Sequence, residues 1–75
     1  MNWQNVFSRG AMEFHVIPDA SNGWLIQASV TLAYRQRFRT QKAAARSARC
    51  MARKYHVPLV IHRLDGRIRQ QFLYR

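Results

Sequence analysis

The stretch from Thr40 to Pro58 constrains the fold more than any other part of the chain. Thr40 has the side chain of a helix N-cap, and Pro58 cannot continue a helix. Between them, small apolar residues recur at the spacing of a helix turn, which predicts an α-helix from Gln41 to about His56. The residues predicted for its inner face are Ala44, Ala48, Met51, Ala52 and Tyr55. Alanines on an inner face let a helix approach a sheet closely.

The segments before this helix predict an antiparallel hairpin. Residues 13–18 and 24–29 alternate between apolar and polar side chains, and the turn formers of residues 19–23 lie between them. Pro18 is expected to end the first strand, and Trp24 is expected to anchor the core. Residues 30–39 predict a third strand with Tyr34, Gln36 and Phe38 on one side, and a loop over residues 30–37 is the alternative.

The segments after the helix predict a second hairpin. Residues 59–64 and 67–73 flank Asp65-Gly66, a pair that favours a two-residue turn of type I′. The predicted order is β-β-(β)-α-β-β, an α+β fold in which one helix packs on an antiparallel sheet. We expect residues 12–75 to form this single domain. Residues 1–11 are expected to be an N-terminal extension, either flexible or ordered.

The positive charge is gathered in the second half of the chain. Twelve of the thirteen basic residues lie between Arg35 and Arg75 with Asp65 as the only acid among them, so this stretch carries a formal charge of +11. The first 34 residues sum to −1. Because like charges repel one another in a compact chain, a polyanionic partner such as DNA or RNA is the natural explanation.

Three groups of cations are the candidate nucleic-acid contacts. One is a face of the predicted helix, one alternates along the third strand, and one flanks the second hairpin turn. They are Lys42, Arg46, Arg49 and Arg53 on the helix, Arg35, Arg37 and Arg39 on the strand, and Arg67 and Arg69 at the hairpin. Each could neutralise a phosphate. The alternative is a solvated surface charge, and the sequence does not show whether the helix and strand groups share one face.

The three histidines raise the question of catalysis or metal binding. His15 and His62 lie on predicted strands and could be neighbours, and His56 lies at the helix end. General acid–base catalysis needs positioned partners, but the three acids lie at a strand start and in turns. Cys50 is the only cysteine, which excludes an intrachain disulfide and a four-cysteine zinc site. We therefore expect no catalytic site, no metal and no small-molecule cofactor.

The sequence also bears on compartment. No apolar run approaches the roughly 18 residues of a transmembrane helix, and the N-terminus lacks the basic and apolar regions of a signal peptide. A free cysteine fits a reducing compartment. We expect a cytoplasmic protein that does not bind membranes.

Several short motifs follow one another in a recognisable order over residues 13–74. They are His15-Val-Ile-Pro18, Gly23-Trp24, Thr40 before an alanine-rich helix, Leu59-Val-Ile-His62, Asp65-Gly-Arg-Ile68 and Tyr74. Together they resemble the DUF2188 family of small bacterial and phage proteins. The resemblance implies a compact α+β domain but no activity, cofactor or catalytic residue. The family pattern mixes acids with bases on the helix, whereas the helix of this chain is purely basic.

These observations favour a small basic nucleic-acid-binding protein that docks on the phosphate backbone with low sequence specificity. The alternative is an inhibitor or adaptor module that binds an acidic protein surface, because the charge fits that partner equally well. A small basic ribonuclease that uses His15 or His62 is the third reading. The sequence does not decide between DNA and RNA, between single and double strands, or between a monomer and an oligomer.

Overall fold

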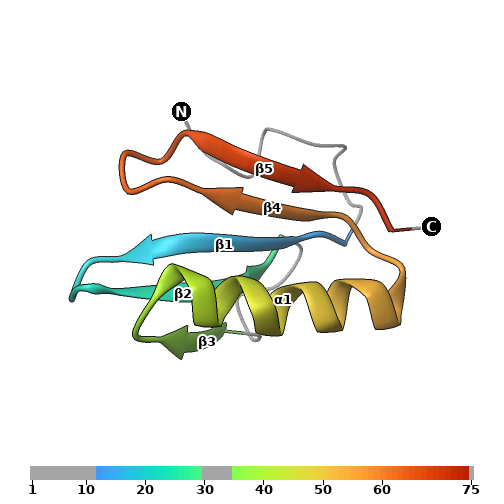
Figure 1. Ribbon diagram of the computed structural model, residues 1–75, viewed down its shortest axis with the longest axis horizontal. Helices are drawn as coiled ribbons and strands as arrows, with labels where there is room; N and C mark the ends of the chain where they lie inside the picture. The colour runs from blue at the N-terminus through green and yellow to red at the C-terminus, as the bar shows by residue number, and fades with distance from the viewer. Residues whose placement is uncertain (1–11, 30–34, 75) are drawn as a thin grey trace.

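One helix packs on one face of a five-stranded sheet in the computed structural model, which describes residues 12–29 and 35–74 (Figure 1). The elements are β1 (Phe14–Asp19), β2 (Gly23–Ala28), β3 (Arg35–Phe38), α1 (Gln41–Tyr55), β4 (Leu59–His62) and β5 (Ile68–Phe72). The predicted α+β class and element order are confirmed, including the third strand. The extension predicted for residues 1–11 lies outside the described residues, as does Tyr34.

The sheet has the strand order β3-β2-β1-β4-β5. Neighbouring strands are antiparallel except β1 and β4, which are parallel, so the prediction of an antiparallel sheet is wrong at its centre. The reason is the crossover. Because α1 carries the chain back to the end of the sheet where β3 began, β4 runs in the direction of β3 and therefore of β1. In Figure 1, α1 lies over the β2–β3 half of the sheet, and β5 forms the opposite edge.

The core lies between α1 and the sheet. Three predicted inner-face residues are completely buried: Ala44, Ala48 and Ala52. They pack with apolar side chains of the sheet such as Val16, Ile26 and Leu59, and Met51 packs at the margin. The prediction that Tyr55 belongs to this face is wrong, since Tyr55 is 59% exposed. It is the last residue of the helix, where the chain turns away.

Both ends of α1 are capped. The Thr40 side chain accepts a hydrogen bond from the Ala43 N–H at 3.1 Å, which confirms the predicted N-cap. At the other end, His56 takes the left-handed conformation with φ 56°. The Val57 N–H donates to the Ala52 carbonyl at 3.0 Å, which is the long bond of a Schellman motif.

Replacing His56 by glycine is expected to raise the free energy of unfolding by about 0.5–1 kcal/mol, because glycine has no Cβ to oppose the left-handed conformation. His56→Ala keeps the Cβ and should bring no such gain. Urea unfolding of the two variants measures the difference. Equal stability of the glycine and alanine variants would show that the backbone of residue 56 carries no strain.

The second hairpin has a three-residue connection, so the predicted type I′ turn is wrong. The Arg63 N–H donates to the Arg67 carbonyl at 2.7 Å, and the Gly66 N–H donates to the Arg63 carbonyl at 2.9 Å. A type I′ turn needs positive φ at both central residues, but within this turn only Gly66 has it, at 88°. The extra residue places Leu64 and Asp65 at the tip of the hairpin.

Strand β1 runs one residue past Pro18, which was expected to end it. The bond from the Phe14 N–H to the Pro58 carbonyl, 2.9 Å long, shows that the even-numbered N–H groups of β1 point toward β4. Pairing with β4 ends at Val16. The missing N–H of Pro18 therefore removes no bond from the sheet, and the strand continues.

In the first hairpin, Asn22 is the residue with positive φ (65°). Gly23 is needed for a different reason, because it allows the neighbouring strand to approach closely. A Cβ on Gly23 would lie 2.9 Å from the Phe38 carbonyl oxygen of β3. We expect Gly23→Ala to lower the free energy of unfolding by about 1 kcal/mol, a modest cost because β3 is a short edge strand that can shift. Chemical denaturation measures it, with the exposed Ser21→Ala of the same turn as control. A neutral effect of Gly23→Ala would contradict the close approach.

Candidate nucleic-acid interface

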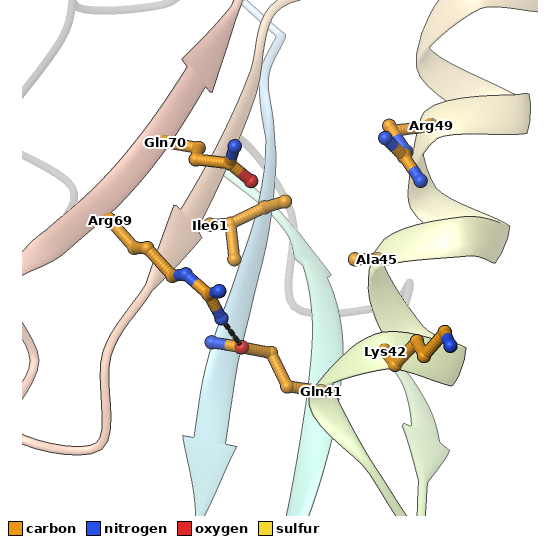
Figure 2. A pocket seen from close by; sticks show the side chains of 7 residues that line it. All are labelled: Gln41, Lys42, Ala45, Arg49, Ile61, Arg69 and Gln70. Atoms are coloured by element: carbon orange, nitrogen blue, oxygen red, sulfur yellow. Dashed lines mark hydrogen bonds between the residues drawn. The ribbon is translucent and has the colours of Figure 1, made fainter.

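A groove with cations on both walls runs between α1 and β5 (Figure 2). Its volume is about 240 Å³. The helix contributes Gln41, Lys42, Ala45 and Arg49, and the sheet contributes Ile61, Arg69 and Gln70. The groove exists because α1 packs over β1, β2, β3 and β4, so that its basic flank stands beside the inner surface of the edge strand. Members of two predicted groups meet here: Lys42 and Arg49 of the helix cations and Arg69 of the hairpin cations.

Gln41 links the two walls of the groove. Its Nε2 donates to the His62 carbonyl oxygen at 2.9 Å, and its Oε1 accepts a hydrogen bond from the Arg69 guanidinium. Figure 2 shows Arg69 reaching from β5 to the Gln41 side chain. A β-bulge brings Arg69 there: Ile61 pairs with Gln70 but His62 pairs with Ile68, so strict alternation is broken at Arg69. Gln41 thus fixes the position of a cation across the groove.

Two aromatic rings hold the next cations along the helix. The Arg49 guanidinium lies over the Phe72 ring and the Arg53 guanidinium over the Tyr74 ring, each 5.9 Å from the ring centroid. The rings themselves are nearly parallel, with centroids 6.0 Å apart. Cation–π contacts at exposed sites contribute about 0.5–1 kcal/mol each. They restrict two otherwise mobile side chains while leaving the charges accessible to a ligand.

The acids of the protein lie elsewhere. Glu13 is buried, and Asp19 pairs with Arg37. Asp65 accepts a hydrogen bond from the Arg67 N–H at 2.9 Å, and its other oxygen is 3.7 Å from the Arg67 guanidinium. Since the sequence contains three acids, no carboxylate side chain among residues 12–29 and 35–74 compensates the charges of the groove.

The strand arginines are not brought to the groove. Arg37 and Arg35 pair with Leu25 and Gln27, whose side chains face away from α1. Arg37 also has local partners: its Nε lies 2.8 Å from an Asp19 carboxylate oxygen, and its Nη2 donates to the Ser21 carbonyl at 3.1 Å. These contacts tie β3 to the first hairpin, which gives Arg37 a structural role.

The remaining predicted cations lie at the periphery. Arg46 is exposed on α1 beyond the groove, and Arg39 follows β3 beside the first hairpin. The Arg67 guanidinium lies 3.7 Å from Asp65 at the second hairpin turn, and its side chain is exposed. Of the nine candidates, Lys42, Arg49 and Arg69 therefore line one groove, and Arg53 extends its charge along the helix.

A buried pair of histidines lies on the other face of the sheet. His15 and His62 are 0% and 1% exposed, and the His15 Nδ1 is 3.0 Å from the His62 Nε2. The His62 Nδ1 is 2.9 Å from the Gly66 carbonyl, which can only accept, so this nitrogen carries a proton. With both rings neutral, the His15 Nδ1–H donates to His62. The predicted neighbourhood is confirmed, and neither ring faces the groove.

The carboxyl group of Glu13 completes this buried row. Its Oε1 lies 3.5 Å from the His15 Nε2, and its side chain is 3% exposed. Burial raises the pKa of Glu13 to about 6. Burial, with a further contribution from the charge of His62, lowers the pKa of His15 to about 3. The row links β1, β4 and the second hairpin beneath the groove.

Within residues 12–29 and 35–74, no three His, Cys, Asp or Glu side chains are grouped to hold a metal ion. In that part of the chain no helix has the length and apolar character needed to cross a bilayer.

Sequence reasoning missed the residues that shape the groove. Gln41 and Gln70 are uncharged and give no signal in the sequence, and nothing in the sequence marks Phe72 or Tyr74 as the partner of a cation. Their contacts depend on which strand lies beside α1. A comparison of the basic helix flank with the strand order could have pointed to them.

Comparison with known proteins gives a family. A family model described as "Uncharacterized protein conserved in bacteria (DUF2188)" matches residues 14–74. No curated protein and no solved structure gives a significant match. The matched region contains all six elements of the fold, from β1 to β5. The resemblance seen in the sequence is thereby confirmed, and the chain belongs to the DUF2188 family.

Proposed function

We propose that the protein is a nucleic-acid-binding module that docks on the sugar–phosphate backbone through the groove between α1 and β5. The observation that carries this proposal is the line of cations at the groove, Lys42, Arg49, Arg53 and Arg69, with no carboxylate side chain beside them among the described residues. Each phosphate neutralised by such a cation releases counterions, which makes binding favourable and dependent on salt.

The arrangement favours a chain of phosphates over an acidic protein surface. From Lys42 to Arg53 the helix rises about 16 Å, which is long enough to follow several consecutive phosphates, since each strand of a duplex carries one phosphate per about 3.4 Å of helix axis. The guanidinium groups of Arg49 and Arg53 are held by aromatic rings, so little side-chain freedom is lost on binding. Contacts of this kind read charge and not base sequence, so low specificity is expected.

Fluorescence anisotropy tests the proposal with labelled single-stranded DNA, duplex DNA and RNA, from about 50 to about 300 mM salt. We expect log K to fall linearly with log salt, with a slope of about −2 to −4.5 for three to five phosphates. Absence of binding to all three at about 150 mM salt would contradict the proposal. An acidic protein partner would then be the better explanation of the charge.

A further inference from the structure

A second hollow adjoins the groove and has a different lining. Its volume is about 350 Å³, within the range of about 300–1,000 Å³ typical of small-molecule sites. It shares Gln41 and Arg69 with the groove and adds Arg63, Trp24 and Leu64. An indole and an aliphatic side chain therefore lie directly beside the line of cations.

The two apolar side chains are exposed to different degrees. Trp24 is half-buried: it packs against the core at the start of β2, and its remaining surface borders the hollow. Leu64, at the tip of the second hairpin, is 79% exposed, the highest exposure of any large apolar side chain in the described part of the chain. Phosphate binding needs neither of them, because an apolar surface offers nothing to an anion.

Resting on the proposed function, we infer that this hollow receives one base of a single-stranded nucleic acid. The base stacks on the exposed part of Trp24 and against Leu64, while Arg63 and Arg69 hold the phosphates on either side. Aromatic platforms inside a cationic groove are typical of single-strand binding, since an unpaired strand can turn a base face outward. In a duplex the bases are stacked on one another and present only their edges in the grooves.

Tryptophan fluorescence reports on this hollow. The chain has two tryptophans, so Trp3→Phe leaves Trp24 as the only one. This variant is titrated with oligothymidylate, with an abasic oligonucleotide of equal length, and with a duplex. Anisotropy of the labelled ligands gives each affinity independently of the fluorescence. We expect oligothymidylate to quench Trp24 and to bind about 5- to 150-fold more tightly than the abasic strand, the usual range for stacking of one base.

Leu64→Ser provides a second readout that does not disturb the core. It should weaken oligothymidylate binding severalfold and leave abasic binding unchanged. Leu73→Ser is the matched control, because Leu73 is also exposed (63%) but does not line the hollow. It should change neither affinity.

The outcomes separate this inference from the proposed function. Equal affinity for the abasic strand and oligothymidylate, without quenching, would overturn the base site and leave phosphate docking in place. Preferential binding of the duplex would also overturn it and would point to Leu64 as a wedge between base pairs. Failure of all three ligands to bind would overturn both.

Discussion

Replacing Lys42 and Arg49 together by glutamate is expected to weaken binding of a single-stranded oligonucleotide about a hundredfold or more. Each substitution removes a phosphate contact and introduces a carboxylate that repels the backbone. Because two phosphate contacts are lost, the slope of log K against log salt should become shallower by about 2. Anisotropy titration at a fixed low salt concentration measures the loss, and circular dichroism checks that the exposed substitutions preserve the fold.

Arg35→Glu combined with Arg39→Glu is the matched control. It changes the net charge by the same amount as the groove variant, but Arg35 lies on the far face of the sheet and Arg39 beside the first hairpin. We expect this control to lose affinity only severalfold, through the general field of the protein. Equal losses in the two variants would mean that the groove has no special role and that charge alone attracts the ligand.

Glu13→Gln is expected to change how stability depends on pH. Folding raises the pKa of Glu13 from 4.5 to about 6, so the carboxyl stabilises the folded state below pH 4.5, and this contribution is lost as the pH rises through 6. The loss amounts to about 2 kcal/mol. Glutamine has no such loss and can still donate to the His15 Nε2, as the protonated carboxyl would. As the pH rises from about 4 to about 7.5, the free energy of unfolding of the variant minus that of the natural protein should therefore increase by about 2 kcal/mol.

The same comparison exposes the effect of His15, which has the opposite sign. Its pKa falls from 6.5 to about 3 on folding, so its contribution is present above pH 6.5 and is lost as the pH falls toward 3. In the natural protein Glu13 offsets this loss between pH 6 and 4.5. The Glu13→Gln variant should instead lose stability continuously below pH 6.5. Urea unfolding at several pH values measures both curves, and a difference between them that is independent of pH would contradict the raised pKa of Glu13.

The elements of the fold could be read from the sequence because each has a local cause. Thr40 caps a helix whose alanine stripe must be buried, and alternating residues mark the strands on either side. The direction of β4 has no local signal, because it is set by the crossover through α1 and by the strand order of the whole sheet. The turn at Asp65-Gly66 was mistaken for a shorter one, because the added residue, Leu64, has no turn signal of its own.

The candidate site was only partly predictable. The helix cations followed from periodicity, since a basic flank without acids stands out in any sequence. The place of Arg69 did not, because a β-bulge redirects its side chain and no residue type marks that bulge. The separation of Arg37 from the helix cations also needed the sheet, because its partner Asp19 lies on a different strand. These placements depend on which distant segments pair in the sheet, and that pairing could not be read from the sequence.

Amide chemical-shift mapping by NMR tests the proposed interface most directly, with isotope-labelled protein titrated by a short single-stranded oligonucleotide. Binding through the groove predicts that the largest shifts fall on both walls, at Gln41, Ala45 and Arg49 on α1 and at Arg69 and Gln70 on β5. Shifts confined to Arg35 and Arg37 on the far face of the sheet, or no shifts at saturating oligonucleotide, would contradict it.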